Sequence, residues 1–242
     1  MIRKSLLRLV VALGLVSLLS ACAVNPMVQL KPEFWTQTDR TVVVAIATLP
    51  DTAAHKVGAQ GLLDLAINNA MADDLSTALK TITLHNSYGQ ARSEVVRRLQ
   101  EKGIKSSFTE TMINAGTLKD FSSDDKSRSY APKDFRPLKA DLGGADRLLL
   151  FTVTQVGTQR SYYGFIPTSG PTAILRATGE MIDLQTNEVL WREQTANTAV
   201  IADPWDQPPE FKNVNTAVQQ VIEAARKTMV EKLFSASTVA AK

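Results

Sequence analysis

Few side chains in this chain are able to bind a metal or act as a nucleophile: it contains one cysteine, Cys22, and two histidines. His55 and His85 are expected in or beside loops, and neither has a second histidine or a carboxylate at metal-ligand spacing. Surface histidines are the simpler interpretation. The adjacent acids at 73–74 and 124–125 are typical of solvated faces, and nothing pairs them as a general acid and base. The sequence therefore predicts no metal site, no cofactor and no catalytic residue.

The sequence motifs of two common catalytic sites are also missing. No G-x-S-x-G elbow is present to activate a serine. The glycines at 143–144 are not followed by the helix and lysine of a phosphate-binding loop. These absences favour a protein that is not an enzyme.

Cys22 stands where an N-terminal export signal would end. Three basic residues within the first eight positions precede an apolar stretch over 6–19, which is too short for a comfortable membrane span. The sequence Leu-Ser-Ala-Cys at 19–22 resembles the lipobox, where bacterial lipoproteins are cleaved and lipidated. The resemblance implies a signal peptide over 1–21 and a mature Cys22 that carries diacylglycerol and an amide-linked fatty acid such as palmitate. The alternative is a plain signal peptide with a chance cysteine.

The residue after Cys22 predicts the membrane in which the lipid would sit. In Gram-negative lipoproteins an aspartate at this position commonly signals retention in the inner membrane, whereas this chain has Ala23. The resemblance therefore implies the outer membrane, with the protein facing the periplasm. Each buried methylene contributes about 0.8 kcal/mol, so several acyl chains would hold the protein firmly.

The charge of the mature chain excludes one class of partner. Removing residues 1–21 takes away three basic residues and no acidic one, which leaves 24 Lys and Arg against 24 Asp and Glu. A formally neutral chain lacks the basic surface that nucleic-acid binding requires. Because no second cysteine exists, disulfides are excluded as well.

Hydrophobic periodicity predicts an α+β fold: a mixed β-sheet with a three-strand antiparallel C-terminal part, covered by helices. Asn187 is expected in the last hairpin turn and Trp191 at least partly buried on the returning strand. Strands are predicted over 41–49, 104–109, 147–156, 174–184 and 188–201, with a short strand also considered at 81–84. Helices are predicted over 58–80, 90–102, which Gly103 would end, 138–142 and 214–234.

The remaining segments divide the chain into four parts. Residues 1–21 are the signal peptide, 22–40 the lipidated N-terminus and tether, 41–234 the periplasmic domain, and 235–242 a disordered tail. Within the tether, Phe34 and Trp35 are expected to dock on the domain, with a membrane contact as the alternative. Within the domain, the polar stretch over 114–137 is expected to be a long solvated loop.

An unusually apolar connection is expected between two of the strands. Tyr162, Tyr163, Phe165 and Ile166 fall where a hairpin tip would normally be polar. We predict that these four side chains form a contact site for a protein or a membrane. The alternative is that the segment folds back onto its own domain.

Three segments carry a family resemblance: the strand at 41–49, the sequence GADRLLL at 144–150 and the sequence EMIDLQTNEVLW at 180–191. Together they resemble a group of periplasmic α/β domains that includes the curli-secretion lipoprotein CsgG, the N-terminal domain of TolB and LpoB-type activators of penicillin-binding proteins. Asn187 stands where that group usually has a turn glycine. The resemblance implies a non-catalytic adaptor or assembly and secretion accessory with other envelope proteins as partners. A homo-oligomer stays open, and the alternative function is a cell-wall-acting enzyme or a regulator of one.

Overall fold

A computed structural model of the chain describes residues 25–59, 61 and 73–235. The predicted signal peptide, Cys22 and residues 236–242 of the predicted tail lie outside these residues. In chain order, with 3-10 helices labelled η, the elements are η2 (Pro32–Thr36), β1 (Thr41–Ile46), β2 (Ala53–Val57), α3 (Asp73–Lys80), α4 (His85–Glu101), β3 (Lys105–Phe108), η3 (Ala115–Thr117), α5 (Leu138–Asp141), β4 (Arg147–Tyr163), β5 (Ile166–Pro167), β6 (Thr172–Asp183), β7 (Val189–Val200) and α6 (Lys212–Ser235).

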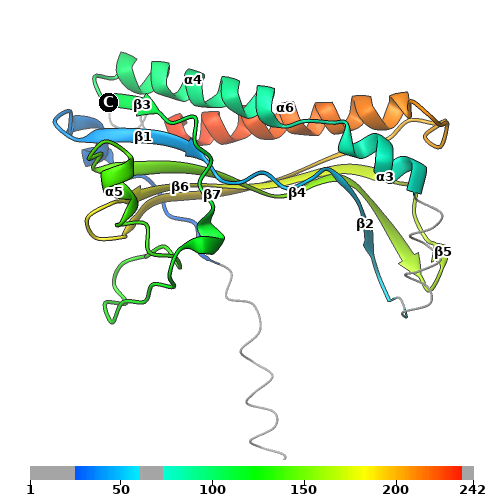
Figure 1. Cartoon of the computed structure of the whole chain (residues 1–242), viewed down its shortest axis with the longest axis horizontal. Helices are drawn as coiled ribbons and strands as arrows, with labels where there is room; N and C mark the ends of the chain where they lie inside the picture. The colour runs from blue at the N-terminus through cyan, green and yellow to red at the C-terminus, as the bar shows by residue number, and fades with distance from the viewer. Residues whose placement is uncertain (1–24, 60, 62–72, 236–242) are drawn as a thin grey trace, which may run out of the picture.

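The strands form one mixed sheet of seven strands in the order β3-β1-β4-β6-β7, with β2 and β5 paired to β4 off this path. Strand β1 is parallel to β3 and β4, whereas β4, β6 and β7 are antiparallel to their neighbours. Helices α4 and α6 lie along one face of the sheet (Figure 1). The predicted α+β fold with a three-strand antiparallel C-terminal part is therefore confirmed.

Strand β4 is the longest strand and runs the length of the sheet. Along one edge it pairs first with β1 and then with β2, both parallel. The second pairing requires Gly157, because a Cβ there would lie 1.9 Å from the carbonyl oxygen of Ala53. Its φ of 129° is also a conformation that side chains rarely adopt. The predicted strand stopped at residue 156 because the polar residues that follow hid this continuation.

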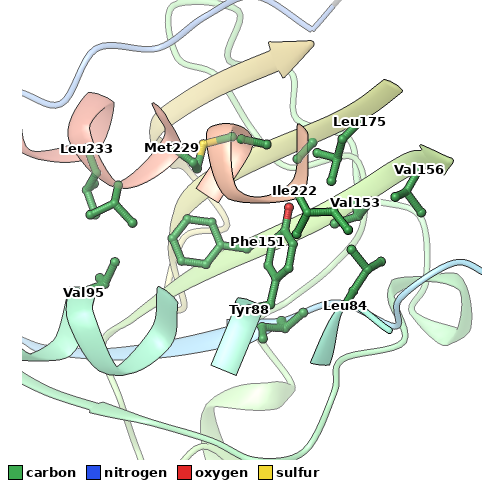
Figure 2. Packing of buried hydrophobic residues seen from close by; sticks show 14 of the residues in the cluster. Leu84, Tyr88, Val95, Phe151, Val153, Val156, Leu175, Ile222, Met229 and Leu233 are labelled. Carbon is green, nitrogen blue, oxygen red and sulfur yellow. The ribbon is translucent and has the colours of Figure 1, made fainter. Parts of the chain in front are cut away.

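The core between sheet and helices holds aromatic and branched side chains. Met181 pairs with Trp191, which is buried as predicted, and a Cβ at Gly179 would lie 2.7 Å from its ring. Figure 2 shows α4 and α6 meeting over β4, with side chains that include Tyr88, Val95, Phe151, Ile222, Met229 and Leu233.

On the opposite face, the described residues form a covering layer near the start of β4. There the segment between β3 and α5 packs on a second apolar cluster that includes Leu148 and Leu150. Ala131 and Phe135 of this segment are buried, so the prediction of a solvated loop over 114–137 is wrong for this part. This part of the segment is held against the sheet by Asn187, whose buried side-chain amide bonds to its backbone.

Asn187 adopts the left-handed turn conformation that a glycine would also adopt, and in addition its side chain makes hydrogen bonds that a glycine could not. Its φ of 66° is left-handed, as predicted. Its side chain accepts a hydrogen bond from the amide of Phe135 at 2.9 Å. It also donates to the carbonyls of Ala131 at 3.1 Å and Lys133 at 2.9 Å. The turn therefore ties the long segment to the sheet.

The N-terminal segment lies on the domain over residues 28–40. Val28 forms a bridge with Arg192, and Leu30 and Phe34 are buried. Trp35 packs against Phe34 and Phe234 at ring-centroid distances of 4.9 and 5.7 Å. Docking, not membrane contact, is thus the role of Phe34 and Trp35.

Several predicted boundaries differ from the structure. Strand β2 was not predicted, and of the helix expected over 58–80 the described residues contain only α3 at its end. Residues 81–84 form a turn, because the amides of Thr81 and Ile82 bond back to Ala78 and Leu79. Helix α4 starts at residue 85, before Gly89, and ends at Glu101. As predicted, Gly103 follows the C-cap Lys102 and has the left-handed φ of 79° that terminates a helix.

Candidate contact site at the hairpin end of β4

The four predicted contact residues lie on a short hairpin that joins β4 to β5. Tyr162 pairs with Pro167 and Tyr163 with Ile166, and Gly164 has a φ of 60° in the turn. The expected loop is therefore an extension of the sheet. We call residues 157–167, with β2 beside them, the hairpin end of β4.

Strand alternation sends these four side chains in two directions. Tyr162 and Pro167 face a cavity on the helix side of the sheet, and Phe165 at the turn reaches the same cavity. Tyr163 and Ile166 point the other way and are 73% and 55% exposed. Phe165 is 57% exposed, so the segment does not fold back into the core. Whether it contacts a partner stays a prediction.

The cavity has a volume of about 300 Å³ and lies between β2, β4, α3 and the segment before α6. Its walls are mainly aromatic rings and prolines, with two basic and two acidic side chains and one histidine among them. These lining residues are Tyr162, Phe165, Trp205, Phe211, Pro167, Pro171, Pro208, Lys56, Arg160, Asp74, Asp206 and His55. Such a volume is at the lower limit of small-molecule sites.

Arg160 is held in the cavity by one hydrogen bond and by contacts with two aromatic rings. Its Nε donates to the backbone carbonyl of Ser169 at 2.9 Å. Its guanidinium carbon lies 4.9 Å from the ring centroid of Trp205 and 5.9 Å from that of Tyr162. Arg160 forms no ion pair with any other described residue, so its terminal nitrogens are available to an acceptor from outside.

Lys56 and His55 are two further titratable groups of the cavity. Burial lowers the pKa of the Lys56 ammonium. His55 is half-buried and its Nε2 lies 2.9 Å from the carbonyl oxygen of Val156, which ties the ring to the backbone. Among the residues that the structure describes, no three His, Cys, Asp or Glu side chains are grouped to hold a metal.

The sequence also contains one catalytic spacing, on the segment between β3 and α5. Ser123 and Lys126 stand at the S-x-x-K spacing of serine enzymes that act on cell-wall precursors. Lys126 Nζ, however, donates to the backbone carbonyl of Ser123 at 2.6 Å. The Ser123 hydroxyl accepts from the amide of Asp125 at 3.2 Å. On this exposed segment the lysine is not placed to activate the serine.

Two arginines with buried side chains lie toward the other end of the sheet, Arg147 at the start of β4 and Arg192 on β7. Arg147 lies under the N-terminal segment, 4.8 Å from the Phe34 ring centroid, and its Nη2 bonds to Gln37. Its Nε and Nη1 have no hydrogen-bond partner among the described residues, and burial lowers its pKa. Arg192 bonds to Glu180 at 2.7 Å and to the carbonyl of Pro26 at 3.3 Å. Sequence reasoning missed both, because each is a single arginine within an apolar strand.

No protein-family model matches the chain, and no curated protein matches it significantly. Solved structures give distant likenesses that include bacterial lipoproteins. Lipoprotein GNA1162 from Neisseria meningitidis is 14% identical, covering 76% of this chain and 99% of its own, with a TM-score of 0.30. Protein XCC0632 from Xanthomonas campestris is 10% identical, covering 91% and 94%, with a TM-score of 0.36. The LpoB C-terminal domain from Salmonella enterica is 12% identical, covering 65% and 82%, with a TM-score of 0.17.

With TM-scores below 0.5, these likenesses are too distant to assign this chain a family or a function. They also do not single out the group of CsgG and TolB that the sequence resembles. Among the described helices, none is both long and apolar enough to cross a bilayer.

Proposed function

We propose that this chain is a lipoprotein of the outer membrane, held by a lipid on Cys22 and facing the periplasm. Its domain acts there as a non-catalytic adaptor that binds other envelope proteins. The observation that carries the adaptor role is the aromatic cavity at the hairpin end of β4, where the terminal nitrogens of Arg160 can donate to a partner group. The lipid rests on the lipobox-like sequence at 19–22.

The cavity favours a short segment of a partner protein over a large ligand. Its rings of Tyr162, Phe165 and Trp205 offer apolar surface to one inserted side chain. Arg160 then donates from its terminal nitrogens to a carboxylate or a backbone carbonyl beside that side chain. Because the lining holds both acidic and basic groups, apolar fit and this hydrogen bond, not net charge, select the partner.

The adaptor role is tested by site-specific photo-crosslinking in intact cells. A photoreactive amino acid in place of Phe165 is expected to give a discrete adduct with an envelope protein, because that ring lies at the mouth of the cavity. Arg160→Ala in the same chain should abolish the adduct. The matched control is the photoreactive residue in place of Met112, an exposed apolar side chain on the segment after β3.

Equal adducts at 165 and 112, or an adduct unchanged by Arg160→Ala, would exclude the cavity as the binding site. The lipid has a separate test. Cys22→Ser removes the thiol to which the lipid is attached, so the precursor should stay unprocessed and lose labelled palmitate. Unchanged labelling would end the lipoprotein proposal, and recovery of the wild type in the inner membrane would refute the sorting inferred from Ala23.

A further inference from the structure

The outer face of the hairpin is a cluster of exposed apolar side chains that the cavity does not use. Tyr163 and Ile166 form a cross-strand pair on this face. Val57 pairs with Ser161, so alternation places it on the same face, where it is 38% exposed. No charged residue occurs between 161 and 171. We call Val57, Tyr163 and Ile166 the outer cluster.

The outer cluster lies on the side of the sheet from which the N-terminal segment leaves. Trp191 and Gly179 face α6, so their neighbours Arg192 and Glu180 face away from the helices. Pro26 is bonded to Arg192 on that side. Figure 1 shows β2 and the end of β4 bending away from α4 and α6, toward this same side.

The chain between the lipid and this face is very short. Cys22 precedes Pro26 by four residues, which span at most about 14 Å when fully extended. Met27, next to Pro26, is also exposed. If Cys22 carries the lipid, as the proposed function has it, the face of the sheet opposite the helices is held close to the bilayer.

We infer that the outer cluster inserts into the interfacial layer of the bilayer that holds the Cys22 lipid, as a second membrane contact. Tyrosine is favoured at that depth because its ring is apolar and its hydroxyl stays hydrated, and valine and isoleucine suit the adjoining acyl region. The absence of charge over 161–171 removes the main cost of insertion.

This second contact fixes how the domain lies on the membrane. Glu180, bonded to Arg192, pairs with Leu150 of β4, and 13 residues separate Leu150 from Tyr163. Measured along the strand at about 3.3 Å per residue, this separation is about 40 Å. Strand β4 therefore runs along the membrane plane, and α4 and α6 face the periplasm.

The test uses the fact that lipidation consumes the thiol of Cys22, so a new cysteine is the free thiol of the lipidated chain. The full-length lipidated protein with Tyr163→Cys is labelled with an environment-sensitive fluorophore. It is reconstituted into vesicles of phosphatidylethanolamine and phosphatidylglycerol, with or without brominated acyl chains. Ile166→Cys is a second position on the same face, and Lys227→Cys, exposed on α6, is the control.

Blue-shifted emission and several-fold quenching by brominated lipid at 163 and 166, but not at 227, are expected. Absence of quenching at both hairpin positions on protein that floats with the vesicles overturns the inference. A photo-crosslink from position 163 to a protein instead of lipid in cells overturns it in favour of a protein partner. The mass of the N-terminal peptide reports the lipid separately: without it the proposed function fails, and the second contact fails with it.

Discussion

The two ends of β4 differ in what covers them. Near Arg147 the strand is buried on both faces, by α4 and α6 on one side and by the segment that Asn187 holds on the other. Toward Tyr163 the helix side is covered, whereas the described residues leave much of the opposite face exposed. Exposed side chains on that face are Thr154, Arg176, Gln194, Thr198 and Val200, although Ile174 between them is buried.

The arginines at the two ends differ in the same way. Arg147 and Arg192 are buried and hold the N-terminal segment through Gln37, Phe34 and Pro26. Arg160 keeps its terminal nitrogens free of the described residues and rests on the Trp205 ring. A buried charge with incomplete partners costs stability and fixes geometry, whereas a stacked, accessible one is available for recognition. One end of the strand thus holds the domain together and the other is free to bind.

The largest expected effect on stability comes from comparing two tryptophans, Trp191 in the core and Trp205 beside the hairpin end of β4. Trp191→Ala should lower the free energy of unfolding by about 3 to 5 kcal/mol, because it empties a filled site between Gly179 and Met229. Trp205→Ala, at the half-buried cavity wall, should cost less than half as much. Urea denaturation measures both, and equal losses would show that the hairpin end is as tightly packed as the other.

The next largest effect on the free energy of unfolding is expected at Asn187. Two substitutions distinguish its turn conformation from its side-chain hydrogen bonds. Asn187→Ala leaves three buried backbone groups of the 131–135 segment without partners and strains a left-handed turn, which should cost about 3 kcal/mol. Asn187→Gly keeps the turn geometry and loses only the hydrogen bonds, so it should cost about 1 kcal/mol less. If both variants unfold like the wild type, the segment does not depend on this side chain.

The contrast also explains which features the sequence made predictable. Strands β6 and β7 and helix α6 show regular apolar spacing, and β1 is a continuous apolar run, because these elements bury a face, a stripe or both faces. The end of β4 shows neither pattern, since Gly157, Gln159 and Ser161 on its outer face are polar or small. Strand β2 stayed hidden for the same reason: it is a five-residue edge strand with mixed polarity.

The site was predictable in part. An apolar run without charge marked Tyr162, Tyr163, Phe165 and Ile166, and three of these four are exposed. Some of these side chains face the cavity and others the outer face because β4 continues through residue 163. No local sequence pattern indicated that continuation. Arg160 and Trp205 are 45 positions apart in the chain, and only the fold brings them together.

A smaller effect concerns Asp146, which links the entry of β4 to the start of β1. Its pKa lies below the usual value because its carboxylate accepts a hydrogen bond from the Thr41 amide at 3.0 Å, with further bonds from the Thr41 hydroxyl and Lys139. The ionised carboxylate is thus favoured in the folded state. It stabilises the domain above the unfolded-state pKa of about 3.9, and this contribution is lost as pH falls through the folded-state pKa.

Asp146→Asn should therefore lower stability near pH 7 by about 1 kcal/mol and flatten the loss of stability on acidification below about pH 5. Thr41→Val is the matched control. It removes the hydroxyl but keeps the amide donor, so its effect should be smaller. Denaturation midpoints across that pH range measure both variants. If the midpoint of Asp146→Asn falls with pH as in the wild type, ionisation of this carboxylate does not stabilise the domain.

The smallest effect on stability is expected at the hairpin, where Tyr163→Ser is combined with Phe165→Ser. Both rings are mostly exposed, so their loss should change the free energy of unfolding by no more than about 0.5 kcal/mol. The same pair should abolish co-purification of the partner protein and weaken vesicle contact at the outer cluster, since one ring faces the cavity and the other the outer face. A loss of several kcal/mol would mean that the hairpin belongs to the packed core, and the difference between the two ends of β4 would disappear.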